Sequence, residues 1–174
     1  MQTAKRPPEK RDRMFSKTLF QSLFAYHFDL TRRLMDLAGD LSAEDYHQPR
    51  NYGRGSIHDL FFHLLRAVAV WRNALQNGKW GASLQPQDCP TLAALREGLD
   101  REQAAWQALL VNLSPQQIED SLAMTDWRGE EHQIARWKAL QHLILHGMQH
   151  HSELAQALTE KGCSPGNIDY IFYD

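Results

Sequence analysis

The chain lacks any apolar run long enough to cross a membrane, and it has few cysteines. None of its hydrophobic stretches approaches the ~18 residues that a transmembrane helix needs, and its N-terminal segment lacks the apolar core of a signal peptide. Only Cys89 and Cys163 occur among the 174 residues, and they lie far apart in the sequence. We therefore expect a cytoplasmic protein with no membrane partner, in which both thiols are free.

Alternating patterns typical of a sheet are also scarce, and internal repeats and low-complexity segments are missing. Apolar residues instead recur at steps of three or four in four segments, residues 16–38, 57–76, 92–113 and 134–161. Residues 120–133 lose this period, and we expect a short hairpin or an ordered loop there, before the last long helix. The pattern predicts an all-α fold, a four-helix bundle that forms a single domain over residues 14–174.

Capping residues and an apolar tail complete this outline. Ser56, with Asp59 three residues later, predicts a capping box at the start of the second helix. Residues 40–55 are rich in polar residues, proline and glycine, and they predict a long connecting loop of the kind that often borders a functional site. Residues 168–173 are mostly apolar, and we expect them to pack back on the bundle.

Basic residues are concentrated in a short N-terminal tail. Residues 1–13 carry five lysines or arginines against two acidic residues, so the rest of the chain has a net charge of about −5 within a total of −2. We expect this tail to be a disordered, solvated extension. Because the acidic remainder offers no basic groove for a phosphate backbone, we do not expect nucleic acid as a partner.

Histidines are concentrated in the last helical segment, which holds four of the nine in the chain. His142, His146 and His150 recur at steps of four and therefore form one row on the helix. Residues four apart have Cβ atoms about 5–6 Å apart, so two imidazoles of such a row can hold one metal ion at roughly 2.0–2.1 Å each. A third ligand must come from another element. Without one, these histidines are ordinary surface or hydrogen-bonded core residues.

Two further histidines lie in apolar stripes of other helices. His63 is surrounded by apolar residues in the segment that follows Ser56, where an unpaired imidazole is costly, and either a backbone carbonyl or a metal ion would serve as its partner. His27 lies within the apolar stripe of the first helix. We expect it to be a hydrogen-bonded core or cleft histidine.

With these residues in place, the sequence resembles the DinB/YfiT-like superfamily of four-helix-bundle metalloenzymes. The resemblance is carried by His63 in the apolar second helix, by the run HLILHGMQH at residues 142–150, and by the closing Ile-Asp-Tyr-Ile-Phe-Tyr at residues 168–173. It covers nearly the whole chain after the tail. The family's triad, a histidine followed by His-x3-His, corresponds to His63, His146 and His150, and the resemblance implies that they bind a divalent ion at one mouth of the bundle.

The sequence departs from the family after the last of these histidines. Many members continue with Arg-Gly-Gln, where this chain has His151, Ser152 and Glu153, so a substrate-binding role of that arginine or glutamine does not carry over. Glu153 is a candidate catalytic base or hydrogen-bond acceptor for an imidazole, and an ordinary solvated glutamate is the alternative. His142 is either an alternative ligand or a neighbour that hydrogen-bonds near the ligands, which we favour. Whether His151 contributes is left open.

Three neutral imidazoles would give a centre of net charge +2 with a position left for water or substrate, as in catalytic zinc sites. Nitrogen ligands suit zinc, nickel or iron(II), and the sequence does not choose among them. The resemblance implies a transferase that uses a low-molecular-weight thiol, such as bacillithiol or mycothiol, as co-substrate, or a hydrolase of a small molecule. It also implies a homodimer. The alternative is a non-catalytic, metal-binding protein of the response to stress or DNA damage, in which the ion is structural.

Overall fold

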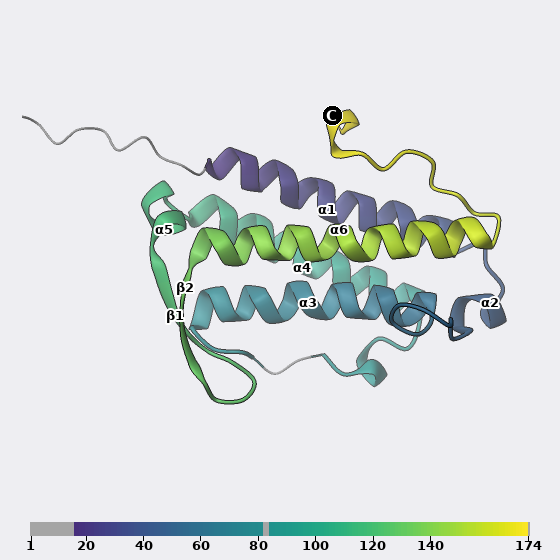
Figure 1. Cartoon of the computed structure of the whole chain (residues 1–174), viewed down its shortest axis with the longest axis horizontal. Coiled ribbons are helices and arrows are strands. Elements are labelled where there is room, and N and C mark those ends of the chain that lie inside the picture. Colours follow the sequence, from purple (N-terminus) through teal and green to yellow (C-terminus); the bar gives the residue numbers. More distant parts are fainter. Residues whose placement is uncertain (1–15, 82–83, 174) are drawn as a thin grey trace, which may run out of the picture.

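Four long helices form where the sequence shows four periodic apolar segments. The computed structural model describes residues 16–81 and 84–173, and the tail predicted for residues 1–13 lies outside the described residues. The helices are α1 (Lys17–Ala38), α3 (Ile57–Asn77), α4 (Leu92–Asn112) and α6 (Arg136–Glu160). The prediction of an all-α four-helix bundle is therefore confirmed (Figure 1).

The helices pack as a ring in which each has two main neighbours. Both α1 and α3 pack against α4 and α6, and α1 and α3 face each other across the centre. Figure 1 shows that α1 and α6 run in one direction and that α3 and α4 run in the opposite direction. The chain between α3 and α4 therefore returns along the length of α3 (Figure 1).

Of the short elements, α2 lies at one end of the bundle, α5 and the strands lie at the other, and the two 3₁₀ turns lie along its sides (Figure 1). They are α2 (Ala43–His47), the 3₁₀ turns η1 (Pro86–Asp88) and η2 (Tyr170–Phe172), α5 (Pro115–Glu119), and the strands β1 (Ser121–Thr125) and β2 (Glu131–Ala135). The expected hairpin is confirmed, because β1 and β2 pair antiparallel with Leu122 opposite Ile134. Residues 40–55 are not all loop as predicted. They contain α2, whose N-cap Ser42 accepts a hydrogen bond from the backbone N–H of Asp45.

Hydrogen-bonding side chains begin each of the first three long helices. The side chains of Ser16, Ser56 and Thr91 accept hydrogen bonds from backbone N–H groups in the first turn. The predicted capping box is present, since Asp59 also accepts a hydrogen bond from the backbone N–H of Ser56. This cap fixes where α3 starts, and with it the position of His63 two turns further on.

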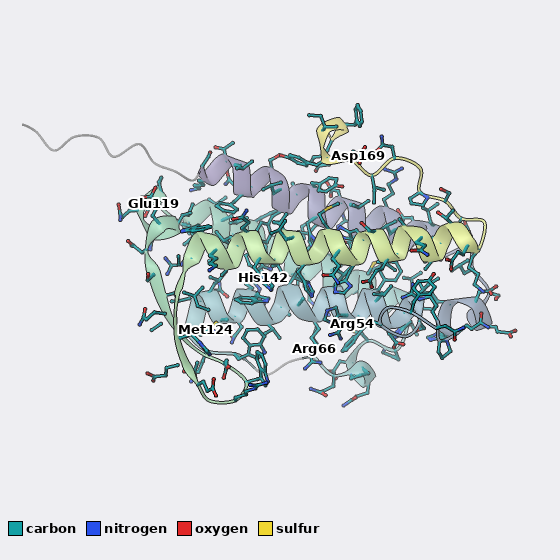
Figure 2. The ribbon with its side chains drawn as sticks, in the orientation of Figure 1. Arg54, Arg66, Glu119, Met124, His142 and Asp169 are labelled. Carbon is teal, nitrogen blue, oxygen red and sulfur yellow. The ribbon has the colours of Figure 1, made fainter. Side chains whose placement is uncertain are left out.

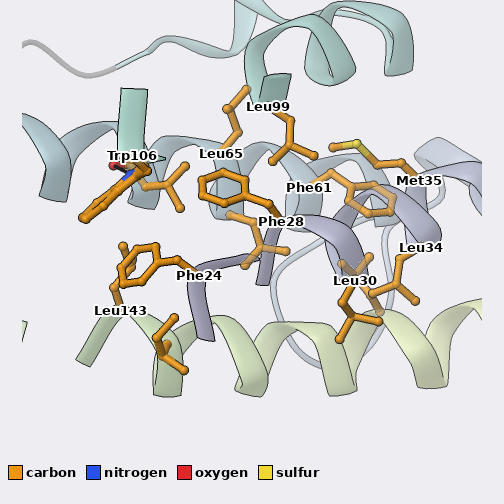
Figure 3. Close-up of a cluster of buried hydrophobic side chains, with 14 of the residues drawn as sticks. Phe24, Phe28, Leu30, Leu34, Met35, Phe61, Leu65, Leu99, Trp106 and Leu143 are labelled. Atoms are coloured by element: carbon orange, nitrogen blue, oxygen red, sulfur yellow. Dashed lines mark hydrogen bonds between the residues drawn. The ribbon is translucent and has the colours of Figure 1, made fainter. Parts of the chain in front are cut away.

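One hydrophobic core joins all four long helices. Figure 3 shows part of it, with Phe24 of α1, Trp106 of α4 and Leu143 of α6 close together. The rings of Phe24 and Trp106 stack with centroids 4.4 Å apart, and the buried indole N–H of Trp106 donates to the carbonyl of Val68 at 3.0 Å. Buried apolar side chains therefore hold the four helices together without help from polar groups at the ends of the bundle.

The C-terminal segment packs back on α1, as predicted. The hydroxyl of Tyr173 donates to Asp29 Oδ2 at 2.5 Å, and the hydroxyl of Tyr26 donates to the carbonyl of Ile168. Cys89 and Cys163 are both free, as the sequence analysis expects. None of the helices in the described part of the chain combines the length and the apolar character that crossing a membrane would require.

Candidate metal centre

The structure brings together three histidines from two helices. His63 comes from α3, and His146 and His150 come from adjacent turns of α6. One ring nitrogen of each lies within 4.8 Å of the other two, and Nε2 of His63 is 2.9 Å from Nε2 of His146. The sequence analysis predicts these three residues as the ligands of a metal ion, and the group could hold one.

Burial keeps two of these imidazoles neutral. The pKa of His63 is lowered from its ordinary value of 6.5 to about 3, chiefly by burial and then by the positive charge of Arg54. The pKa of His146 is lowered to about 4, chiefly by burial and then by His150 and His142. Neutral imidazoles keep a nitrogen lone pair at neutral pH, which is the form that binds a metal ion.

The geometry and the hydrogen bonds of the cluster fit a metal ion. Two imidazole nitrogens bound tetrahedrally to one ion at roughly 2.0–2.1 Å lie about 3.3 Å apart, close to the 2.9 Å between His63 and His146. Nδ1 of His146 is buried and has no hydrogen-bond partner among the described residues. The imidazoles lie close together with their nitrogens turned toward one another, and a shared cation would satisfy all three better than hydrogen bonds between them can.

Glu153 orients the third histidine. Its Oε2 lies 3.1 Å from Nδ1 of His150, one turn away on α6. This contact keeps the proton on Nδ1 and leaves Nε2 of His150 for a ligand, an arrangement common behind metal-bound histidines. Arg50, in the loop before α3, contacts the turn of α6 that carries Glu153. Its Nη1 donates to the backbone carbonyl of Glu153 at 3.4 Å. The structure thus gives Glu153 the role of hydrogen-bond acceptor that the sequence analysis considers.

His142 and His151 lie outside the group of three. The ring of His142 is exposed, with its centroid 5.9 Å from that of His146 and 5.2 Å from that of Trp71. His151 is fully buried on the opposite side of α6, where its Nε2 lies 2.8 Å from the hydroxyl of Thr31. Its ring also lies beside that of His27. His142 is therefore a neighbour of the cluster, and His151 belongs to the packing between α1 and α6.

A cavity opens beside the three histidines. It has a volume of about 220 Å³, and its lining includes His63, His146, Arg66, Trp71 and Trp80. A shallower hollow of about 320 Å³ adjoins it on the other side of His63. Arg54 and Arg66 line both spaces, and Figure 2 shows their side chains with that of His142 along the side formed by α3 and α6.

The sequence analysis misses most of this lining. Arg54 lies in the connection before α3, and Trp80 lies just after that helix, where no periodic pattern marks a residue as facing a site. Trp80 is placed by the hairpin, because its backbone N–H donates to the carbonyl of Thr125 at 2.8 Å. Arg66 and Trp71 lie on α3 three and eight residues after His63, and that spacing is the only signal that could have indicated them.

A second group of possible ligands lies in the turn of the hairpin. Asp126, Glu130 and His132 lie close enough to share a cation. Oδ1 of Asp126 accepts hydrogen bonds from the backbone N–H groups of Arg128 and Glu130, and its Oδ2 lies 3.1 Å from Nε2 of His132. These bonds are typical of a side chain that stabilises a turn, and they account for the group.

Comparison with models of known families gives a match over nearly the whole chain. The model of the DinB family matches residues 14–174, which include all four long helices and the three histidines. No curated protein matches the sequence.

Proposed function

The chain belongs to the DinB family, and from that premise we propose that it is a divalent-metal-dependent enzyme that acts on a small molecule. His63, His146 and His150 would hold the ion, which is zinc, nickel or iron(II). The observation that supports this proposal is that three imidazole nitrogens lie within 4.8 Å of one another, and that two of these imidazoles, those of His63 and His146, line an open cavity. Three neutral nitrogen donors beside open space are typical of catalytic metal sites, whereas structural sites are closed.

The reaction that we propose is transfer of a low-molecular-weight thiol to an electrophile. A bound ion would supply positive charge that favours the thiolate form of the co-substrate. The thiol loses its proton to solvent, its sulfur forms a bond to the electrophilic carbon, and the leaving group departs with the bonding electron pair. Neither Cys89 nor Cys163 lies among the described residues that line the cavity, so the thiol comes from a small molecule. Hydrolysis of a small molecule is the related alternative.

The residues around the histidines would prepare the site for this reaction. Glu153 fixes the ring of His150, so that this ligand does not have to be ordered when the ion binds. The indoles of Trp71 and Trp80 form an apolar wall of the cavity and reduce the water around a bound substrate. Arg54 and Arg66 supply positive charge at its edge.

Thiol consumption by metal-loaded protein tests the proposal. Protein purified without a metal-affinity tag would be loaded with zinc, nickel or iron(II) and mixed with bacillithiol, mycothiol or glutathione and monochlorobimane as the electrophile. We expect one of these metals to support turnover and His150→Ala to abolish it. His132→Ala, which removes an exposed histidine of the hairpin, should retain full activity. Equal turnover by wild type and His150→Ala would refute the enzymatic proposal.

We also propose that the protein is a homodimer. Leu19 of α1 and Ile171 and Phe172 of the C-terminal segment are large apolar side chains with 47%, 81% and 71% of their surface exposed. The hydroxyls of Ser22 and Tyr170 lie 2.8 Å apart, which places the C-terminal segment against this part of α1. Pairing of two copies through this surface would cover it. Sedimentation equilibrium of wild type and of Phe172→Ser tests the proposal, since the variant should shift to monomer.

A further inference from the structure

We propose that the cavity beside the three histidines takes a small planar molecule with one anionic group, its flat part against Trp71 and Trp80 and its anionic group at Arg54 and Arg66. This inference rests on the proposed function, because it names the class of substrate for the same site. The anionic group is a carboxylate or a phosphate, since both offer a guanidinium the same pair of oxygen acceptors.

Aromatic rings form one wall of the cavity. The rings of Trp71 and Trp80 meet edge to face, with centroids 5.1 Å apart and planes at 71°. His142 extends this wall, since its ring lies 5.2 Å from that of Trp71. Both indoles are only partly buried although they are among the largest apolar side chains of the chain. A flat apolar ligand would stack on one indole, meet the other edge to face and remove the exposed surface of both from water, which favours its binding.

Positive charge lies at the edge of the same cavity. Among the described residues that line it, Arg54 and Arg66 are the only arginines, and there is no lysine, aspartate or glutamate. Both arginines also line the adjoining hollow, so they border the same part of the site. This local charge contrasts with the net charge of −2 of the whole chain. An anion would therefore be attracted to this cavity.

Two carboxylates, Asp59 and Glu153, lie near the site. Asp59 lines the adjoining hollow and not the cavity itself. Its Oδ2 is occupied by the backbone N–H and the hydroxyl of Ser56, at 2.9 and 2.8 Å. Glu153 is engaged with His150 behind the cluster. Both arginines line the cavity, and these two carboxylates have hydrogen-bond partners of their own.

The dimensions of the cavity limit the size of the ligand. A volume of about 220 Å³ is below the roughly 300–1,000 Å³ of sites for drug-sized molecules. The cavity therefore suits one aromatic ring, or a conjugated chain of similar length, with its anionic group. Arg66 follows His63 by three residues on α3, so their Cβ atoms are about 5–6 Å apart. An anion at Arg66 would consequently lie close to the three histidines.

Calorimetric titration with three matched probes tests the inference. Trans-cinnamate carries a planar apolar part and a carboxylate, cinnamyl alcohol has the same planar part without charge, and phenyl phosphate offers the other anion. We expect at least one anionic probe to bind roughly tenfold or more tightly than the alcohol, as charge-assisted hydrogen bonds would provide. Arg54→Gln and Arg66→Gln should each remove most of this preference. Arg101→Gln, an exposed arginine of α4, should leave it unchanged.

The titrations would be made on zinc-loaded and on metal-free protein, with zinc content measured by elemental analysis. We expect Arg54→Gln and Arg66→Gln to lose affinity for the anionic probes both with and without zinc. A loss in the metal-free protein cannot come from binding of the anion to zinc, so it would be due to the arginine. Equal affinity for all three probes, or unchanged anion binding in both variants, would overturn the inference even if zinc is bound. Conversely, protein that binds none of zinc, nickel and iron(II) but still prefers the anions would refute the proposed function and support this inference.

Discussion

Gly147 of α6 lies directly against the imidazole of His27 of α1: a Cβ atom at residue 147 would be 2.4 Å from Nδ1 of His27. Glycine in the middle of a helix costs about 1 kcal/mol relative to alanine. Its presence here is explained by the close approach of the two helices, which only a residue without a side chain allows. The relationship also links the core to the candidate site, because Gly147 follows His146 directly.

Gly147→Ala should therefore destabilise the protein, although alanine is the better helix former. The added methyl group would have to displace the ring of His27, which has no free space in the core, and such overpacking typically costs about 1–3 kcal/mol. Urea unfolding followed by circular dichroism measures the change. In the double variant Gly147→Ala, His27→Ala, the methyl group would find space, so its effect should be smaller than in the single variant. A Gly147→Ala protein as stable as wild type would contradict this explanation.

The buried ring of His27 should make the protein sensitive to acid. Burial, with a further contribution from His146, lowers its pKa from the ordinary value of 6.5 to about 4. Above pH 6.5 the ring is neutral in both the folded and the unfolded chain, so the stability is unaffected. As the pH falls from 6.5 to about 4, the unfolded chain takes up a proton that the folded chain does not. The free energy of unfolding should therefore decrease, by roughly 3 kcal/mol for this residue alone.

Unfolding curves between pH 7 and pH 4 test this prediction. His27→Gln cannot take up the proton, and its stability should decrease less steeply over this range than that of wild type. His151, whose pKa is also far below 6.5 because of burial, should add to the wild-type slope in the same direction. His47→Gln, at the exposed end of α2, serves as the control. Identical slopes for wild type and His27→Gln would show that the buried ring does not cause the effect.

The sequence indicates the helices of this site better than it indicates the site itself. His146 and His150 are predictable as a pair, because a spacing of four places them on one face of a helix. His63 is 83 residues away from His146, and no local pattern indicates that its helix lies beside α6. Only the family resemblance indicates that His63 joins the other two histidines. Arg54 and Trp80 lie in connections, where side-chain direction depends on tertiary contacts. The short helix α2 is not predicted for a different reason: its five residues are too few to show a helical period.

Glu153 should increase the metal affinity of the site. Its hydrogen bond from Nδ1 of His150 fixes that ring and makes its other nitrogen a stronger donor, and loss of such a contact typically weakens metal binding roughly 10–100-fold. We expect this loss in Glu153→Ala and a smaller one in Glu153→Gln, which keeps an oxygen acceptor but no charge. Competition with a chromogenic zinc chelator measures it. Glu160→Gln, a carboxylate further along α6 that accepts from Tyr52, should bind zinc like wild type.

Removal of the metal ion should abolish activity and leave the fold intact. Buried apolar side chains from all four long helices form one core, so the bundle does not depend on an ion that joins α3 to α6. After treatment with a chelator we expect the helical circular dichroism to be retained. The melting temperature should decrease only by the amount that corresponds to the lost free energy of ion binding. Loss of helical structure on chelation would instead favour a structural ion and a protein without catalytic activity.

The ion pair between Arg72 of α3 and Glu102 of α4 should contribute measurably to stability, unlike the exposed pairs. It is bidentate, with Nε to Oε2 at 2.7 Å and Nη2 to Oε1 at 2.8 Å. The two side chains are only 23% and 13% exposed. Charge-assisted hydrogen bonds of this geometry contribute about 1.5–3 kcal/mol.

By contrast, Glu97 and Arg101 are 3.9 Å apart on the surface of α4 with side chains 75% and 70% exposed, and a helical pair of this kind contributes about 0.3–0.5 kcal/mol. A double-mutant cycle with Arg72→Ala and Glu102→Ala should therefore give a coupling energy several times larger than one with Glu97→Ala and Arg101→Ala. The coupling of the buried pair should also persist in 1 M salt, because partly buried charges are screened less than exposed ones. Equal coupling energies would indicate that the Arg72 and Glu102 pair is no more than a surface contact. The register of α3 against α4 would then depend on apolar packing and on the hydrogen bond from Trp106 to Val68.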